Sequence, residues 1–138
     1  MLDPADHRPI SIRVPLVFDC ERLSDVLCTA IESGISYWCE SAFVLQYPKN
    51  KKRSDYEWPL YQVPFSNCHN GRIVLCEFDA YAQKQKNHTI NRRKLIAGLR
   101  LLANDYPDYA TDILNETYDA NSADAWIQLC VFKEIKYG

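Results

Sequence analysis

The last twenty residues of the chain constrain its fold more than any other segment. From Asp119 to Gly138 they are typical of a capped helix that is apolar on almost every side and then stops abruptly. A monomer cannot leave that much apolar surface in water, so the helix must pack inside the core. We expect it to run from Ser122 to Glu134, with Asn121 or Ser122 as its N-cap. Its apolar residues are Trp126, Ile127, Leu129, Cys130, Val131 and Phe132.

Length and charge limit what the chain can be. Its 138 residues fit a single domain, 1–138, with one core. A net charge of −2 provides no general attraction to nucleic acid or membrane. No apolar run approaches the ~18 residues of a membrane span, and the polar first nine residues do not resemble a signal peptide. We therefore expect a cytoplasmic protein that has no membrane partner.

The six cysteines are expected to be reduced. None forms a Cys-x-x-Cys pair, and most lie within apolar patterns, where a free cysteine packs as a small hydrophobe. The set comprises Cys20, Cys28, Cys39, Cys68, Cys76 and Cys130.

The first half of the chain predicts mainly strands. Alternating apolar residues over 10–18 predict a half-buried strand, and Pro15 places it at an edge or a bulge. Asp19 is positioned to cap a helix that Gly34 ends in a left-handed conformation. A strand follows over 42–47. The Asn70-Gly71 pair then predicts a hairpin over 60–78.

The second half predicts three helices. Thr89 is the expected cap of a helix that carries Leu95, Ile96, Leu99, Leu102 and Ala103, and Pro107 suits the first turn of a helix over 107–117. Together with the last helix, this order predicts an α+β fold. We expect a mainly antiparallel sheet of three to four strands, with about four helices packed on one face.

Three motifs carry a resemblance to a known group of proteins. They are Ala30-Ile-Glu-Ser-Gly-Ile-Ser-Tyr-Trp38, a helix over 90–102 that ends in Gly-Leu-x-Leu-Leu, and Asp119-x-x-x-Ala-Asp-x-x-x-Gln128 with a closing Phe132-x-Glu-Ile-x-Tyr-Gly138. The chain resembles small uncharacterised proteins carried by phages, prophages and plasmids. Lys133 departs from the glycine expected in the closing motif. The resemblance implies a mobile-element origin and, by analogy, an accessory protein that counters host defences such as CRISPR systems.

No segment encodes a recognisable reaction. Cys68-His69, Cys76 and His88 have the donor chemistry of a zinc site but not its spacing. Cys20, just before the first helix, comes closest to an activated thiol, yet a packed cysteine is the simpler interpretation. Asp124 and Gln128 share a face of the apolar last helix, where a hydrogen-bond network tying helix to sheet explains them better than catalysis. We expect a protein that is not an enzyme and has no cofactor and no metal.

Acidic residues are concentrated in one segment. Asp108, Asp112 and Glu116 are spaced i, i+4, i+8, which predicts one face of the third helix, and Asp105 precedes them. Such a stripe is most often a solvated face, but it can also dock on a basic surface of a protein that handles nucleic acid.

Basic residues form two blocks without acids, residues 49–53 and 84–100, which hold ten of the sixteen Lys and Arg. Aromatic residues flank the first block, and charge combined with stacking surface suits single-stranded nucleic acid. The candidate residues are Lys49, Lys51, Lys52, Arg53, Trp58, Arg93 and Arg100.

These patterns leave two functions open. The favoured one is a non-catalytic accessory protein of a phage or mobile element that binds a host protein or nucleoprotein complex through Asp105, Asp108, Asp112 and Glu116. The alternative is a small nucleic-acid-binding or regulatory protein that uses the basic segments. The oligomeric state stays open.

Overall fold

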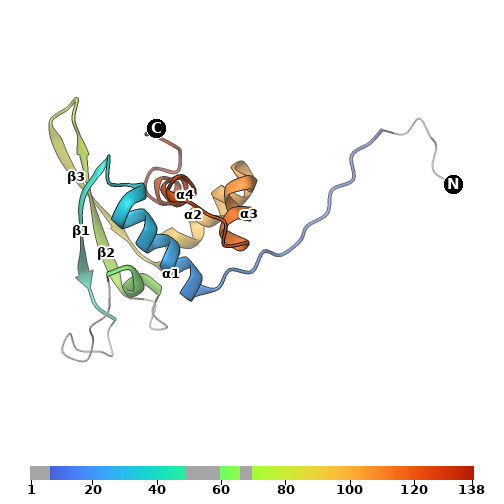
Figure 1. Ribbon diagram of the computed structural model, residues 1–138, viewed down its shortest axis with the longest axis horizontal. Coiled ribbons are helices and arrows are strands. Elements are labelled where there is room, and N and C mark those ends of the chain that lie inside the picture. The colour runs from blue at the N-terminus through green and yellow to red at the C-terminus, as the bar shows by residue number, and fades with distance from the viewer. Residues whose placement is uncertain (1–6, 49–59, 66–69) are drawn as a thin grey trace.

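A three-stranded antiparallel sheet and a layer of helices on one of its faces make up the protein (Figure 1). The structure is a computed structural model that describes residues 7–48, 60–65 and 70–138. The α+β fold expected from the sequence is confirmed. In chain order the elements are α1 (Cys20–Thr29), the π-helical turn η1 (Ala30–Gly34), β1 (Cys39–Gln46), the 3-10 helix η3 (Leu60–Phe65), β2 (Arg72–Asp79), β3 (Lys84–Ile90), α2 (Arg92–Asp105), α3 (Pro107–Leu114) and α4 (Ala120–Phe132).

The middle strand β2 joins the sheet to the core. Its residues Ile73 and Leu75 are fully buried. Ile73 pairs with Val44 of β1 and with Ile90 of β3, so one apolar row crosses all three strands. Neighbouring side chains on one face of a sheet stabilise each other, and this row presents an apolar face to the helices.

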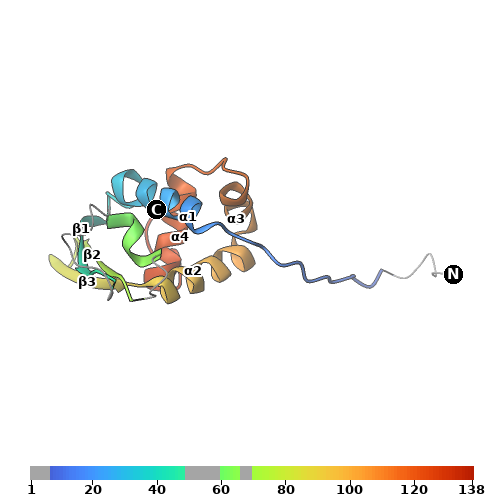
Figure 2. The ribbon, with the colours of Figure 1, turned by 90° about the horizontal axis from the view of Figure 1, so that it is seen from below.

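Helix α4 is the centre of the helical layer, as the sequence predicts (Figures 1 and 2). Trp126 is fully buried, and its indole N–H donates to the Leu95 carbonyl of α2 at 3.1 Å. Gly98 of α2 lets the two helices approach closely, because a Cβ there would lie 2.2 Å from Cys130 Sγ. The N-cap is Asp119 rather than Asn121 or Ser122. Ser122 instead completes a capping box with Asp119.

The strand predicted over residues 10–18 is wrong. These residues are extended, but they form no strand and project from the body of the protein as an arm (Figures 1 and 2). Ile10 and Ile12 are 90% and 81% exposed. An alternating pattern shows that a segment can form a strand, whereas a strand also needs a neighbour, and within the described residues none pairs with this segment.

The hairpin predicted over residues 60–78 is also wrong. The described part of its first half is η3, which contains Pro64. Gly71 is required for close packing, since a Cβ there would lie 2.1 Å from the Val63 carbonyl oxygen. The hairpin that forms joins β2 to β3, and Gln83 in its turn has a φ of 50°. The polar sequence of β3 hid this strand from pattern analysis.

Several helix ends differ from expectation by a few residues. Asp19 caps α1 as predicted, with Oδ1 accepting from the Glu21 N–H at 2.8 Å. Asn91, not Thr89, caps α2, because Thr89 belongs to β3. Gly34 has no left-handed φ; a Cβ there would instead lie 2.7 Å from the Ala120 carbonyl oxygen. Thus close packing, rather than helix termination, accounts for Gly34.

Candidate functional site

The acidic residues do not form the single helical stripe that the sequence predicts. Asp105 ends α2, and Asp108 and Asp112 lie on α3. Helix α3 ends at Leu114 rather than at residue 117, and Glu116 has a left-handed φ of 58°. A residue in that conformation cannot continue a helical face.

The acidic residues also differ in whether their side chains already have a hydrogen-bond or ion-pair partner. Asp105 and Asp108 are exposed, with no ion pair among the described residues. Asp112 accepts a hydrogen bond from the Thr117 hydroxyl at 3.0 Å. Glu116 forms an ion pair with Arg22 of α1 at 3.2 Å, with both side chains more than half exposed. Only Asp105 and Asp108 are thus fully available for a partner.

The basic candidates divide between two parts of the chain. Lys49, Lys51, Lys52, Arg53 and Trp58 lie outside the described residues. Arg93 and Arg100 lie on α2, where helical spacing places them on one face with Ile96 between them. Both arginines are exposed, and neither has an ion-pair partner within the described ranges.

A groove runs along this side of α2. Two hollows, of about 600 Å³ and about 430 Å³, share Arg92, Ile96 and Arg100 as lining residues. Among the described residues, no acidic side chain lines either hollow. We call this feature the arginine groove; its residues are Leu16, Phe18, Cys20, Leu23, Phe65, Asn91, Arg92, Arg93, Leu95, Ile96, Leu99, Arg100 and Ala103.

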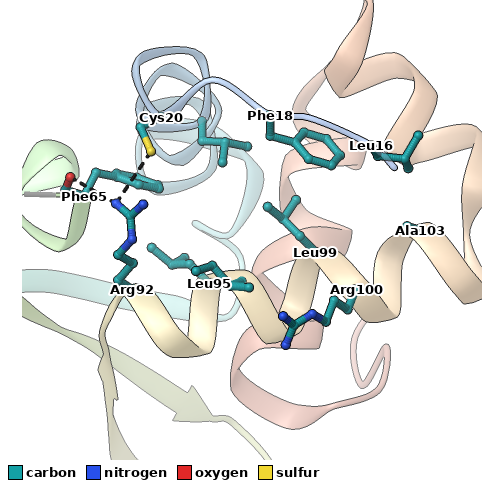
Figure 3. Close-up of a pocket in the computed structure, with 11 residues that line it drawn as sticks. Leu16, Phe18, Cys20, Phe65, Arg92, Leu95, Leu99, Arg100 and Ala103 are labelled. Atoms are coloured by element: carbon teal, nitrogen blue, oxygen red, sulfur yellow. Dashed lines mark hydrogen bonds between the residues drawn. The ribbon is translucent and has the colours of Figure 1, made fainter. Parts of the chain in front are cut away.

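The floor of the groove comes from segments far apart in the sequence. Phe18 and Leu16, at the base of the N-terminal arm, lie over Leu99 and Ala103 of α2, respectively (Figure 3). Phe65 of η3 contributes a second aromatic ring, which also contacts the Trp126 ring at a centroid distance of 6.5 Å. The groove therefore combines an apolar, partly aromatic floor with three guanidinium groups.

Arg92 is held in place across the groove. Its Nη1 donates to the Phe65 carbonyl at 3.4 Å and to Cys20 Sγ at 3.6 Å (Figure 3). Arg100 lies further along α2 and takes no part in this contact (Figure 3). Arg92 is thus fixed at one end, whereas Arg93 and Arg100 are free to meet an anion. The sequence pattern indicates Arg93 and Arg100 but not Arg92 or the floor, because these depend on tertiary contacts.

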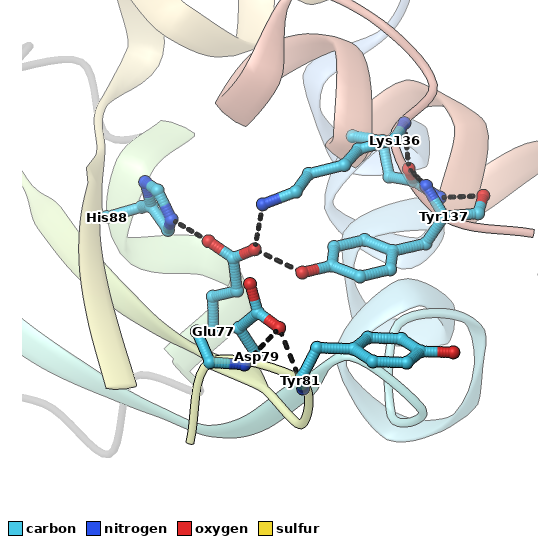
Figure 4. A network of polar contacts seen from close by, with 8 residues as sticks. Glu77, Asp79, Tyr81, His88, Lys136 and Tyr137 are labelled. Carbon is cyan, nitrogen blue, oxygen red and sulfur yellow. Dashed lines mark hydrogen bonds and ion pairs between the residues drawn. The ribbon is translucent and has the colours of Figure 1, made fainter. Parts of the chain in front are cut away.

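A second polar cluster lies between the sheet and the C-terminal segment, and we call it the C-terminal clasp. The Glu77 side chain is only 3% exposed and accepts from Lys136 Nζ at 2.7 Å (Figure 4). The Tyr137 hydroxyl donates to the same carboxylate oxygen, and His88 Nε2 lies 2.8 Å from the other. Burial alone would raise the pKa of Glu77, but the hydrogen bonds from Lys136, Tyr137 and His88 outweigh it and lower the pKa to about 2.

Helix α4 completes the clasp through the two polar residues singled out in the sequence. Gln128 Oε1 accepts the backbone N–H groups of Lys136 and Tyr137, both at 2.8 Å. Asp124 accepts from the Trp38 indole at 2.8 Å and from the Tyr37 hydroxyl at 2.6 Å. The hydrogen-bond network expected for this pair is present, although the partners lie outside the strands of the sheet. It joins the last helix to the C-terminal segment and to the residues before β1.

The polar groups of the clasp are paired with one another and packed against aromatic rings. Each Glu77 carboxylate oxygen has a partner, and the Tyr137 ring stacks on Trp38 at a centroid distance of 5.8 Å. The sequence signal for the clasp is Glu77 itself, a lone carboxylate within an apolar segment. A buried charge must find partners, and the Lys136-Tyr137 pair provides them.

Cys39 and Cys130 are buried thiols whose surroundings disfavour the thiolate. Burial raises the pKa of Cys39 to about 11 and also raises the pKa of Cys130. In the part of the chain that the structure covers, no group of three or more His, Cys, Asp or Glu could hold a metal ion. Cys68 and His69 lie outside it. Among the described helices, none is long and apolar enough to cross a membrane.

No protein-family model matches the chain, and no curated protein or solved structure does so either.

Proposed function

We propose that this protein is a non-catalytic binding protein and that the arginine groove holds an anionic partner. The observation that supports this most directly is that Arg92, Ile96 and Arg100 line both hollows, and that no described acidic residue lines either one. Guanidinium groups bind phosphate and carboxylate through charge-assisted, often bidentate hydrogen bonds. An acidic lining residue would oppose such a ligand, and none of the described lining residues is acidic.

Single-stranded nucleic acid is the partner that this groove fits best. Its phosphates can pair with Arg93 and Arg100, while an unstacked base can lie against Phe18 or Phe65 on the floor. This combination of cations and aromatic surface is the general requirement for binding single strands without strict sequence preference. A rigid double helix has no unstacked base to offer these rings.

The acidic surface supports a second candidate, a protein-directed accessory protein. Asp105 and Asp108 are exposed and adjacent to the start of α3, where they can meet a basic surface of a host protein or nucleoprotein complex. The resemblance to phage- and plasmid-borne proteins extends this candidate to an inhibitor of a host defence complex, of CRISPR type, in the cytoplasm of a bacterial host.

Charge reversal separates the two candidates. Arg93→Glu/Arg100→Glu should abolish binding of a fluorescent oligothymidine in anisotropy titrations, whereas Asp105→Lys/Asp108→Lys should leave it intact or strengthen it. All four side chains are exposed, so circular dichroism should show both variants folded. Full oligonucleotide binding by the arginine variant would contradict the groove proposal. Loss of a host protein from pull-downs with the aspartate variant alone would favour the second candidate.

A further inference from the structure

The N-terminal arm has the features of a strand that lacks its sheet. Between Pro9 and Pro15 the chain is extended and exposed, with Ile10, Ile12 and Val14 between 67% and 90% accessible to solvent. Apolar side chains at every second residue are typical of a strand that buries one face. In water, such a segment exposes apolar surface that normally has a partner.

The two prolines of the arm occur in the same phase. Consecutive residues of a strand direct their N–H groups to opposite edges, so Ile10, Ile12 and Val14 direct theirs to one edge. Pro9 and Pro15, which have no N–H, fall in the alternate phase with Ser11 and Arg13. The arm can therefore pair fully along one edge and is blocked along the other. This is how natural edge strands avoid further growth.

The sheet offers one edge suited to such a strand. Of the two outer strands, β3 carries exposed Lys84 and Lys86, and lysines on an edge oppose pairing with another chain. Strand β1 contains no lysine, and its Phe43 and Leu45 are 45% and 51% exposed. Among the described residues, no strand covers the outer edge of β1.

Charge and direction agree with an acceptor on another molecule. Arg13 is the only charged residue between Pro9 and Phe18, and Glu40 is the only charged residue of β1, so the two charges are complementary. The arm leaves the body on the side away from the sheet and points outward in both views (Figures 1 and 2). The β1 edge of the same chain thus lies on the other side of the body from the arm.

We propose that two copies of this chain exchange arms, and that residues 9–15 of each copy add an edge strand to β1 of the other. Reciprocal exchange closes a twofold dimer, because each copy donates one arm and accepts one. Ile10, Ile12 and Val14 are then covered, and the prolines face solvent at the new edge.

Two proline substitutions at neighbouring positions of the arm, whose N–H groups face opposite edges, test the pairing directly. Ile12→Pro removes an N–H that faces the acceptor, whereas Ser11→Pro removes one that faces away. Both residues are exposed, so each variant should fold as the wild type does. In sedimentation velocity over a concentration series, the wild type should approach twice its 16.0 kDa mass. Ile12→Pro should weaken the dimer by about tenfold or more, and Ser11→Pro should change it little.

Leu45→Lys tests the acceptor. It places a lysine on the β1 edge and should also weaken the dimer. Mixing it with Ile12→Pro should restore some heterodimer, since one intact arm then meets one intact edge. A wild type that is monomeric at every concentration would overturn the proposal. The proposal would also be overturned if Ile12→Pro and Ser11→Pro weaken the dimer equally, or if neither variant weakens it. A dimer unaffected by Leu45→Lys would overturn the assignment to β1.

Discussion

At the scale of single residues, Glu77 makes the free energy of unfolding depend on pH in the acidic range. Its pKa is about 2 in the folded protein and 4.5 in an unfolded chain. Stability from the ionised carboxylate is therefore complete above pH 4.5 and is lost as the pH falls toward 2. A shift of this size corresponds to roughly 3 kcal/mol.

Glu77→Gln should remove this dependence. We expect the variant to be less stable than the wild type at pH 7, and the difference in unfolding free energy should shrink between pH 4.5 and pH 2 in urea titrations. Lys136→Met removes one donor and should move the loss of stability to higher pH. A difference between Glu77→Gln and the wild type that stays constant down to pH 2 would show that Glu77 is not held ionised by the clasp.

Lys133 shows backbone strain at the end of α4. It caps the helix with a left-handed φ of 61°, where glycine is preferred, and it is the position that departs from the closing motif. Lys133→Gly should stabilise the protein by ~0.5–1 kcal/mol, because relief of the left-handed conformation outweighs the greater freedom of glycine in the unfolded chain. Denaturant unfolding measures the gain. Lys133→Ala is the control, and an equal gain from alanine would point to the lost charge instead.

At the scale of elements, α4 is the centre of the core. Trp126→Ala should cost ~3–5 kcal/mol, the usual range for a large buried aromatic, and it also removes the hydrogen bond to Leu95. Tyr81→Ala, at a fully exposed residue, is the matched control and should cost almost nothing. Wild-type thermal stability of the Trp126 variant would show that α4 is peripheral.

The contact of α2 with α4 depends on a missing side chain. Gly98→Ala would place a Cβ 2.2 Å from Cys130 Sγ and should destabilise the protein by ~1–3 kcal/mol through overpacking. The penalty should be smaller when Cys130 is already alanine, because the closest contact is then gone. A double-mutant cycle by thermal unfolding measures this coupling. If Gly98→Ala destabilises the protein equally with Cys130 present and with Cys130 replaced by alanine, the two helices accommodate the new Cβ by moving apart.

Helices with a clear apolar pattern could be predicted from the sequence. Segments whose structure depends on pairing with another part of the chain could not. The apolar stripes of α1 and α2 identified these helices because burial needs only one correct face, and α4 was identified because it is apolar on almost every side. The arm was mistaken for a strand because its pattern shows capacity but not pairing. Strand β3 was missed because a lysine-rich edge strand has no apolar alternation. Arg93 and Arg100 were found by the absence of acids around them, whereas Arg92, Leu16 and Phe18 join them only through tertiary packing.

At the scale of the whole molecule, charge is distributed unevenly despite a net value of −2. Residues 80–104, which include β3 and most of α2, contain six Lys and Arg and no acid. Exposed Asp105 and Asp108 follow directly, so an attractive and a repulsive region for anions adjoin each other. Such a surface attracts anions locally without making the protein basic as a whole, and salt should screen that attraction.

The salt dependence of oligonucleotide binding tests the central claim, that the arginine groove binds phosphates. Each phosphate neutralised on a single strand contributes about −0.7 to the slope of log Kobs against log salt. With Arg93 and Arg100 each pairing with a phosphate, an oligothymidine should bind with a slope of about −1.4 or steeper. Arg100→Gln should make the slope shallower by about 0.7. Absence of binding at low salt, or a slope that Arg100→Gln leaves unchanged, would contradict the account.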